Sequence, residues 1–418
     1  MPSCLDNSVN DICTTTTNTA TNTATRKNTR RCRVVLYSHD TMGLGHMRRN
    51  LLIARALAQS PINPTILLIA GAREVGTYSL PKFVDCFVLP SYYKNTNGQY
   101  QPRHLDVKNH ELLQLRSKTI LSVLESFGPD VFIVDNVATG ALGELDLAMN
   151  YLRKSKKTRC VLGLRDIQDD HTVTQSQYLA TEKAYRDYYD AIWIYGDPGV
   201  YDLKKVCQFS PEISKKIHYT GYFDHRERIK QIDDLNLQRE LQHILDTNKK
   251  LVVCTVGGGQ DGDTLAQQFC RARLPDEYEG VLITGPYMPA DTKQELLKHS
   301  LDKPNLHIID FLKEPTYLIS RADRIIGMGG YNSICEVLSF EKRALIVPRI
   351  TPRTEQWVRA QCLNQLGLID ILHPNEITSE KIVSWLLTDG PDIKHVKQRI
   401  DFNGLKKLPD LISKIARI

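Results

Sequence analysis

Short apolar runs alternate with helix-like segments along most of the chain. In the first half, runs of strand length occupy residues 34–37, 65–70, 83–89, 131–134, 160–164 and 191–195. Strands separated by single helices are typical of parallel pairing through right-handed crossovers. The pattern therefore predicts a doubly wound α/β domain, with one long helix that begins at an Asp106 N-cap and ends at Gly128-Pro129.

The second half repeats this pattern. Its apolar runs occupy residues 251–256, 281–284, 307–311, 323–327 and 344–347. We therefore expect two Rossmann-like doubly wound domains facing a cleft, at residues 32–222 and 223–395. Residues 1–31 are expected to form a disordered Thr/Asn-rich tail, and residues 396–418 a basic C-terminal helix.

The composition is typical of a globular protein and narrows the functional class. Of 418 residues, 41% are hydrophobic and 24% charged, and the net charge of +6 permits an anionic ligand without demanding one. Lysines and arginines occur in scattered pairs, which argues against nucleic acid as a partner. Ten single cysteines without a C-x-x-C pair argue against a zinc site and favour a reducing compartment. No apolar run has the length of a membrane span, so we expect a cytoplasmic protein. Peripheral contact with the inner membrane face, with Tyr78, Tyr92, Tyr93 and Tyr100 as contributors, stays open.

The stretch from Gly327 to Gln356 carries the strongest chemical signal. A glycine turn after an apolar run lets backbone N–H groups approach an anion at the start of the next helix. Glu336, six residues beyond Gly330, is placed to accept hydrogen bonds from sugar hydroxyls. Glu355-Gln356 follows the next strand, at the edge where ligands of open α/β sheets bind. The stretch predicts a nucleotide-sugar pocket.

A second glycine-rich segment, Gly257–Gly262, follows the first strand of the second half. It matches G-x-G-x-x-G, but no acidic residue ends the following strand near Thr284, so a dinucleotide cofactor is the second choice. A second interpretation of this segment is a loop that holds a diphosphate or donor sugar. A third is a tight turn that binds no ligand. Asp261 and Asp263 imitate a D-x-D metal motif, but they begin a predicted helix, where carboxylates complement backbone donors.

Candidate acceptor-side residues follow two strands of the first half. The loop after the first strand contains Gly43 and Gly45 and ends in His46, and histidine can take up a proton near neutral pH. Asp40 is the rival base and His39 a weaker one, while a helix cap or loop anchor is the structural alternative. Arg165 and Asp166, together with the Asp169-Asp170-His171 segment, fit either a polar acceptor site or a surface ion-pair cluster.

The spacing Gly330-x-x-Ser333-x-x-Glu336, followed by Glu355-Gln356 and Arg359-Ala360, resembles the donor site of GT-B glycosyltransferases of the family 28 (MurG-like) type. Residues 161–170 and 219–224 resemble an uncharacterised bacterial branch of predicted glycosyltransferases. The resemblance implies two Rossmann domains, no metal and no cofactor, and an acceptor-side role for His46. It also implies a set of donor contacts in the second domain. These are Gly258, Gly259 and Gln260 near the diphosphate, Gly329, Gly330 and Ser333 opposite, Phe311 and Leu312 at the base, Glu336 at the ribose, and Glu355 and Gln356 at the sugar.

These observations together predict an inverting hexosyltransferase. The donor would be a nucleotide-diphosphate sugar, a UDP-sugar first among them, and the acceptor hydroxyl is unidentified. Hinge motion near residues 221–224 would close the cleft. A UDP-sugar epimerase or hydrolase of the same fold, with Asp166 and Asp169 as extra acids, is the alternative, and a non-catalytic nucleotide-binding protein is a third reading.

Overall fold

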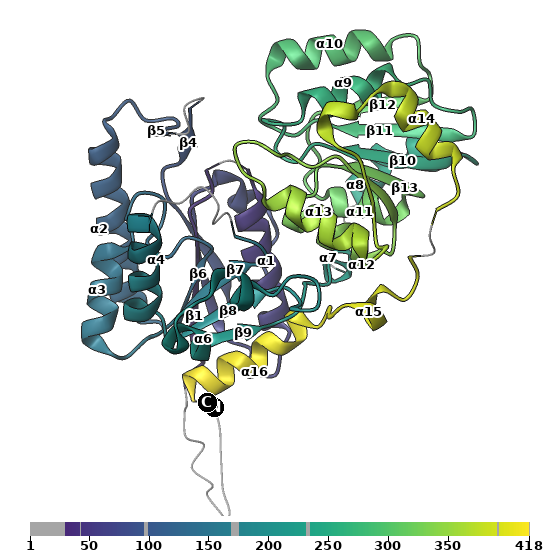
Figure 1. Cartoon of the computed structure of the whole chain (residues 1–418). Helices are drawn as coiled ribbons and strands as arrows, with labels where there is room; N and C mark the ends of the chain where they lie inside the picture. The colour runs from purple at the N-terminus through teal and green to yellow at the C-terminus, as the bar shows by residue number, and fades with distance from the viewer. Residues whose placement is uncertain are drawn as a thin grey trace, which may run out of the picture. The chain divides into compact units, whose positions relative to one another are not determined.

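Two parallel sheets, one in each half of the chain, organise the structure (Figure 1). It is a computed structural model that describes residues 30–41, 43–95, 99–168, 175–230, 235–390 and 393–417. Residues 31–418 form one compact unit. No helix in the described ranges has the length and apolarity that a membrane span requires.

The sheet of the first domain has seven strands in the order β3-β2-β1-β6-β7-β8-β9, all parallel. The strands are β1 (Arg33–Ser38), β2 (Thr65–Ala70), β3 (Val84–Val88), β6 (Val131–Asp135), β7 (Arg159–Arg165), β8 (Ala191–Tyr195) and β9 (Ile217–Tyr219). Strands β2 and β3 lie on one side of β1 in the sheet, and β6 to β9 lie on the other side. The carboxyl ends of β1 and β6 therefore form a topological switch point, where open sheets bind ligands.

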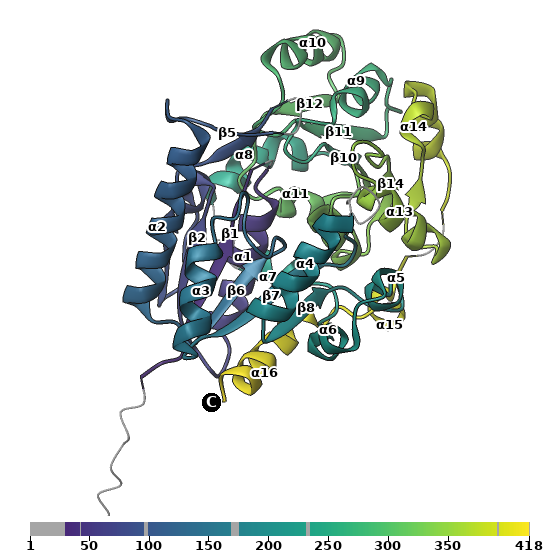
Figure 2. The ribbon, with the colours of Figure 1, turned by 60° about the vertical axis from the view of Figure 1, so that its left-hand side comes forward.

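Successive residues of β1 point into two different cores, as the period of a strand requires. Val34 and Leu36 belong to the core that contains α1, whereas Val35 and Tyr37 belong to the core beneath α2, α3 and α4. The two layers are visible in Figure 2. The helices are α1 (Gly45–Ala58), α2 (Asn109–Phe127), α3 (Asp146–Ser155), α4 (Gln175–Tyr188), α5 (Leu203–Cys207), α6 (Pro211–Lys216) and the short 3-10 helix η1 (Arg73–Thr77).

The sheet of the second domain has the order β12-β11-β10-β13-β14-β15, again all parallel. Its strands are β10 (Lys250–Thr255), β11 (Tyr278–Ile283), β12 (Leu306–Ile309), β13 (Arg324–Gly327), β14 (Arg343–Ile346) and β15 (Asp370–Ile371). Its helices are α8 (Leu235–Leu245), α9 (Asp263–Arg271), α10 (Ala290–Ser300), α11 (Pro315–Arg321), α12 (Tyr331–Ser339), α13 (Glu355–Gln365), α14 (Ser379–Leu387) and the 3-10 helix η3 (Pro374–Glu376). The switch point here lies between β10 and β13, so both glycine-rich loops meet there. The prediction of two doubly wound Rossmann-like domains is confirmed.

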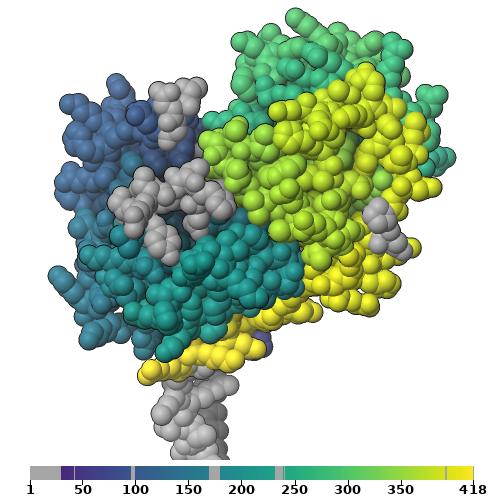
Figure 3. All heavy atoms as spheres, viewed as in Figure 1, coloured from purple at the N-terminus to yellow at the C-terminus, as the bar shows by residue number. Residues whose placement is uncertain are grey.

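The chain passes between the domains twice. After β9, α7 (Arg226–Ile229) leads into the second domain, and after α15 (Val396–Arg399) the chain returns. At the return, Tyr222 N donates to Asp401 O (2.8 Å) and Gly404 N donates to Tyr222 O (3.1 Å). The last helix, α16 (Gly404–Ala416), then packs against α1 of the first domain, and Figure 3 shows this segment in yellow along the teal part of that domain.

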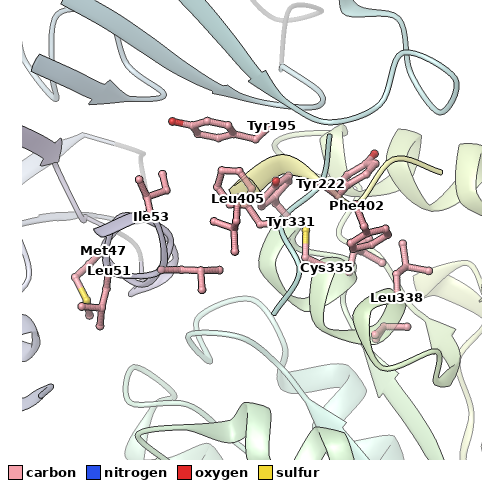
Figure 4. Packing of buried hydrophobic residues seen from close by; sticks show 14 of the residues in the cluster. Met47, Leu51, Ile53, Tyr195, Tyr222, Tyr331, Cys335, Leu338, Phe402 and Leu405 are labelled. Carbon is pink, nitrogen blue, oxygen red and sulfur yellow. The ribbon is translucent and has the colours of Figure 1, made fainter. Parts of the chain in front are cut away.

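Side chains from both domains share one apolar cluster. Figure 4 shows Met47 and Leu51 of α1 in the same region as Tyr331 and Cys335 of α12 and Leu405 of α16. Tyr222 stacks on Tyr331 with ring centroids 6.1 Å apart. This continuous apolar contact holds the carboxyl edges of the two sheets near one another.

Two local expectations were wrong. The long helix α2 begins at Asn109 rather than after Asp106, because Glu111 accepts a hydrogen bond from the Lys108 backbone N–H (2.8 Å) and fixes the start there. The suggested membrane-facing tyrosines are not all at the surface, since Tyr92 is buried beside Arg116 and Tyr78 is buried with its hydroxyl bonded to Lys313 O. Tyr92 and Tyr100 instead lie in a hairpin, β4 (Tyr92–Lys94) and β5 (Tyr100–Pro102), which the sequence did not predict.

Candidate functional site

The two switch points open into one shared cavity of about 350 Å³. Most of the residues predicted for the site line it. From the first domain these are Gly43, Gly45, His46 and Arg165; from the second, Gly258, Phe311, Leu312, Gly330, Ser333, Glu336, Glu355 and Gln356. The remaining predicted residues, Asp40, Asp166, Gly259, Gln260 and Gly329, are not part of this lining.

His46 lies in the first turn of α1, at the carboxyl end of β1. Its Nδ1 is 2.8 Å from Oδ2 of Asp135, the last residue of β6, so the dyad spans the switch point. Arg49, one turn further along α1, pairs with both oxygens of Asp135 (2.7 Å each). Burial raises the pKa of Asp135, but Arg49 and His46 outweigh it and lower the pKa to about 2. Asp135 therefore stays ionised and fixes the histidine ring.

The second nitrogen of the His46 ring is available to a ligand. Nε2 has no hydrogen-bond partner among the residues that the structure describes, and the ring lines the cavity. Arg49 Nη2 also lies 3.0 Å from Nδ1. In the tautomer whose Nδ1–H donates to Asp135, Nε2 can accept a proton, which is the arrangement of an oriented general base. His39 also lines the cavity, but burial, and then His46, lowers its pKa well below the usual value.

Asp40 has a backbone role in the structure. Its carboxylate accepts from Met47 N (2.8 Å), Gly71 N (3.1 Å) and the Ser38 hydroxyl (2.6 Å), and it is buried. These bonds tie the loop after β1 to the start of α1 and to the end of β2. Asp40 is therefore not part of the cavity lining, although the hypothesis of Asp40 as the base requires its carboxylate to be there.

Asp166 is likewise engaged away from the cavity. It forms a bidentate pair with Arg359 of α13 (2.7 and 2.9 Å) and accepts from the Tyr222 hydroxyl (3.0 Å), and all three side chains are buried. Arg359 also donates to Gly329 O (3.0 Å). The expected acceptor contact is therefore replaced by a buried ion pair that joins the two domains. The neighbouring Asp169–His171 segment lies outside the described residues.

Glu336 lies in the middle of α12 and is buried, so it is not a surface helix carboxylate. Its Oε1 accepts from Thr316 Oγ1 (2.7 Å) and from Arg48 of α1 (3.2 Å). Burial raises the pKa of Glu336, but Arg48, His225 and Arg228 together hold it below its usual value. An ionised acceptor therefore faces the cavity at the position predicted for a ribose.

The two glycine loops of the second domain meet at the β10/β13 switch point. Gly259 has φ +91°, and a Cβ there would come within 2.4 Å of Thr284 O, so only glycine fits. Gly330 is the N-cap of α12, and a Cβ there would meet nothing within 4 Å. The N-terminus of α12 is therefore open, with backbone N–H groups and the Ser333 side chain facing the cavity.

Arg349, which the sequence did not single out, connects the remaining donor-side residues. It pairs with Asp261 of the Gly257–Gly262 loop (2.7 Å) and with Glu355 (2.7 Å), and its backbone N–H donates to Gln356 Oε1 (3.1 Å). Asp261 is thus held by an arginine, in agreement with a structural role. Among the described residues, no group of three or more His, Cys, Asp or Glu side chains is arranged to hold a metal ion.

Phe311 and Leu312, in the loop after β12, behave differently from one another. Leu312 is buried in the core, whereas Phe311 has 42% of its surface exposed. Both line the cavity beside Pro315 and Ile319 of α11. The apolar wall and backbone groups of this loop are compatible with a planar base, although no side chain there is specific for one.

Comparison with known proteins agrees with this architecture. Residues 252–415 match the glycosyltransferase family 28 C-terminal domain. An uncharacterized glycosyltransferase of Methanosarcina mazei is 24% identical over 314 residues, which are 71% of this chain and 76% of that protein. The second domain is therefore similar to the family 28 C-terminal domain over nearly its whole length.

A further relative and two solved structures are also similar to this chain. A UDP-N-acetylglucosamine–N-acetylmuramyl-(pentapeptide) pyrophosphoryl-undecaprenol N-acetylglucosamine transferase of Sulfurihydrogenibium is 23% identical over 186 residues, 43% of this chain and 51% of that protein. MurG from Acinetobacter baumannii has a TM-score of 0.53 at 14% identity, covering 92% of this chain and 99% of its own. UDP-GlcNAc 2-epimerase from Neisseria meningitidis, bound to UDP-GlcNAc, has a TM-score of 0.58 at 13% identity with the same coverage. At these identities the structures show the fold, which is that of GT-B glycosyltransferases, and the relatives show a transferase enzyme.

Besides Arg349, the sequence analysis missed three residues of the site, namely Asp135, Arg48 and Arg49. Asp135 ends an apolar run, and its position opposite the loop after β1 was the available signal. Arg48 and Arg49 are close to His46 in the sequence. However, no sequence pattern indicates that Arg48 contacts Glu336 and that Arg49 contacts Asp135.

Proposed function

We propose that the enzyme transfers a glycosyl group, with inversion, from a UDP-sugar to an acceptor hydroxyl, with His46 as the general base. One observation carries the proposal. The same cavity is lined by His46, oriented by Asp135 on the first domain, and by Glu336 with the open N-terminus of α12 on the second. A base and a nucleotide-sugar site that face each other are what a direct displacement requires.

In this mechanism the acceptor oxygen attacks the anomeric carbon while its proton passes to His46 Nε2. The bond from the anomeric carbon to the diphosphate oxygen breaks, and UDP leaves with the bonding electron pair. Backbone N–H groups at the N-terminus of α12 and in the Gly258–Gln260 loop would stabilise the charge on the diphosphate. Glu336 would accept hydrogen bonds from the ribose, and Glu355 and Gln356 would contact the donor sugar. No metal enters this proposal, so turnover should persist in EDTA.

The preference for UDP has its support in the named relatives. One of them is a UDP-N-acetylglucosamine transferase, and one structural neighbour was solved with UDP-GlcNAc bound. The apolar wall at Phe311 and Leu312 fits a base of any identity, so the preference rests on those proteins.

A UDP-sugar epimerase or hydrolase is the second candidate, favoured by the epimerase among the structural neighbours. Asp166, one acid on which that alternative depended, is paired with Arg359 outside the cavity. In the described part of the first domain, the cavity lining contains no carboxylate. This distribution favours a histidine base over acid–base chemistry by first-domain carboxylates.

Incubation with UDP-N-acetylglucosamine, followed by NMR, tests the proposal. Slow transfer to water should release UDP and a free sugar that is initially the β-anomer, and His46→Gln should abolish the release. An epimerised nucleotide sugar, with the UDP linkage intact at equilibrium, would instead identify an epimerase. Release to water that added hydroxyl acceptors do not divert into a glycosylated product would identify a hydrolase.

A further inference from the structure

The carboxylate proposed to bind the donor ribose is held by the opposite domain. Arg48, in α1 of the first domain, donates to Glu336 Oε1 (3.2 Å) and to Thr316 Oγ1 (3.3 Å) of the second. It lines the cavity together with Glu336, and both side chains are largely buried, with exposed fractions of 14% and 3%. An ion pair between the domains therefore forms part of the wall of the donor site.

The polar contacts of Glu336 are concentrated on one of its two carboxylate oxygens. Arg48, Thr316, His225 (3.6 Å) and Arg228 (3.7 Å) all approach Oε1. Within the described ranges, Oε2 has no hydrogen-bond partner. It is also absent from the buried atoms that lack a partner, so it is accessible. Oε2 is thus the oxygen that remains for a ligand, while Oε1 is fully used in fixing the carboxylate.

The remaining charges of this cluster do not duplicate Arg48. Arg228 of α7 lies 3.7 Å from both Glu336 and Glu314, and its Nε and Nη1 atoms lack hydrogen bonds. Burial, and then the positive charge of Arg48, lowers the pKa of Arg228 to about 10. Arg48 is the guanidinium that hydrogen-bonds to the carboxylate, and together with the Thr316 hydroxyl it fixes the position of Oε1.

We propose that Arg48 is a positioning residue of the donor site, which orients Glu336 so that Oε2 receives the ribose hydroxyls. The inference rests on the proposed UDP-sugar function. It makes the donor site a joint product of both domains: the ribose carboxylate is aligned only when α1 of the first domain lies against α12. Donor affinity and the approach of the two domains are then coupled, because each favours the same arrangement.

The test compares UDP with 2′-deoxy-UDP by calorimetry, since only the former has the full ribose diol. Wild-type enzyme should prefer UDP by about tenfold or more, the ratio expected for a hydrogen bond to a charged acceptor. In Arg48→Met that preference should fall to less than about threefold, and Arg48→Lys, which keeps the charge, should recover part of it.

Arg55→Met is the matched control. Arg55 is a second buried arginine of α1, which donates to Ser79 O and does not contact Glu336. Its replacement should leave the preference for UDP unchanged. If Arg48→Met weakens both nucleotides equally and keeps the preference, Arg48 is only an ion pair between domains and the inference is overturned. If the wild type binds neither nucleotide, the proposed function itself falls.

Discussion

At the residue scale, the site is built from charged side chains that are buried in pairs. Asp135 orients His46, and Arg48 contacts Glu336, and in each case one ring nitrogen or one carboxylate oxygen remains for a ligand. Sequence reasoning selected His46 and Glu336 because their residue types and spacing suggest chemistry. Their partners, Asp135 and Arg48, were not selected, because a pairing across 89 or 288 positions has no local pattern.

Replacement of the proposed base separates catalysis from donor binding. His46→Gln should lower kcat for UDP-sugar turnover by about 100-fold to 10,000-fold, the range for loss of a general base. UDP affinity should stay within about threefold, because the proposed donor contacts lie on the second domain. Steady-state kinetics and UDP titration measure the two effects. Wild-type turnover in His46→Gln would remove the base assignment.

The pH dependence of UDP-N-acetylglucosamine binding reports the ionisation of Glu336. Because Arg48, His225 and Arg228 overcome burial and hold the pKa of Glu336 below its usual value, the carboxylate stays ionised. The affinity for UDP-N-acetylglucosamine, whose diphosphate does not titrate in this range, should therefore be level between pH 7 and 5. Burial lowers the pKa of His225, and Glu314 and Tyr78 are the other titratable groups that face Arg48. In Arg48→Met the pKa of Glu336 rises, so affinity should fall as the pH falls. A level profile in Arg48→Met would contradict this electrostatic description.

At the element scale, buried parallel strands were the most predictable feature. Residues 65–70 and 191–195 were predicted as strands with the bounds that the structure has, because Gly71 and Gly196 end these apolar runs. The β4–β5 hairpin was missed because Tyr92–Lys94 and Tyr100–Pro102 are too short for a period to show. The start of α2 was misplaced because Asp106 and Glu111 are both helix-start signals and only the latter is used.

The two glycine loops offer a paired prediction. Gly259→Ala should destabilise the protein by about 1–3 kcal/mol, since φ +91° and the 2.4 Å approach to Thr284 O both exclude a side chain. Gly330→Ala should change stability by less than about 1 kcal/mol, because φ is −60° and the space is open. It should nevertheless weaken UDP binding, because the added methyl group enters the proposed diphosphate site.

Denaturant unfolding and UDP titration of both variants check this pair. The order of the effects is the diagnostic result: a loss of stability for Gly259→Ala and a loss of binding for Gly330→Ala. Equal stability losses would show that the α12 N-terminus is not an open site. Unchanged UDP binding in Gly330→Ala would remove the diphosphate from that position.

At the scale of the whole molecule, the function requires two sheets whose switch points face one another. The sequence predicts each doubly wound sheet, because apolar runs and crossovers are local features. It does not predict which charged residues meet between the domains: Asp166 was read as an acceptor contact, yet it lies buried against Arg359 and the Tyr222 hydroxyl. The alternative of an ion-pair cluster was nearer the outcome, but the pair is buried between the domains rather than at the surface.

Loss of that buried pair should destabilise the whole unit. Arg359→Met leaves the Asp166 carboxylate buried without its cation, which should cost about 3–5 kcal/mol of unfolding free energy. Asp166→Asn together with Arg359→Met should cost less than the sum of the single changes, because the two side chains interact directly. Urea unfolding of the three variants measures this. Additive losses below about 1 kcal/mol each would show that the pair does not hold the domains together.

The most direct test of the central claim is calorimetric titration of UDP into wild-type protein, Glu336→Ala and a surface control, Glu295→Ala. Glu295 lies on α10 and pairs with the exposed Arg271, away from the cavity. Wild type and Glu295→Ala should bind UDP with equal affinity, and Glu336→Ala should lose at least about tenfold in affinity. UDP binding that survives Glu336→Ala unchanged, or binding of NAD in its place, would contradict the central claim.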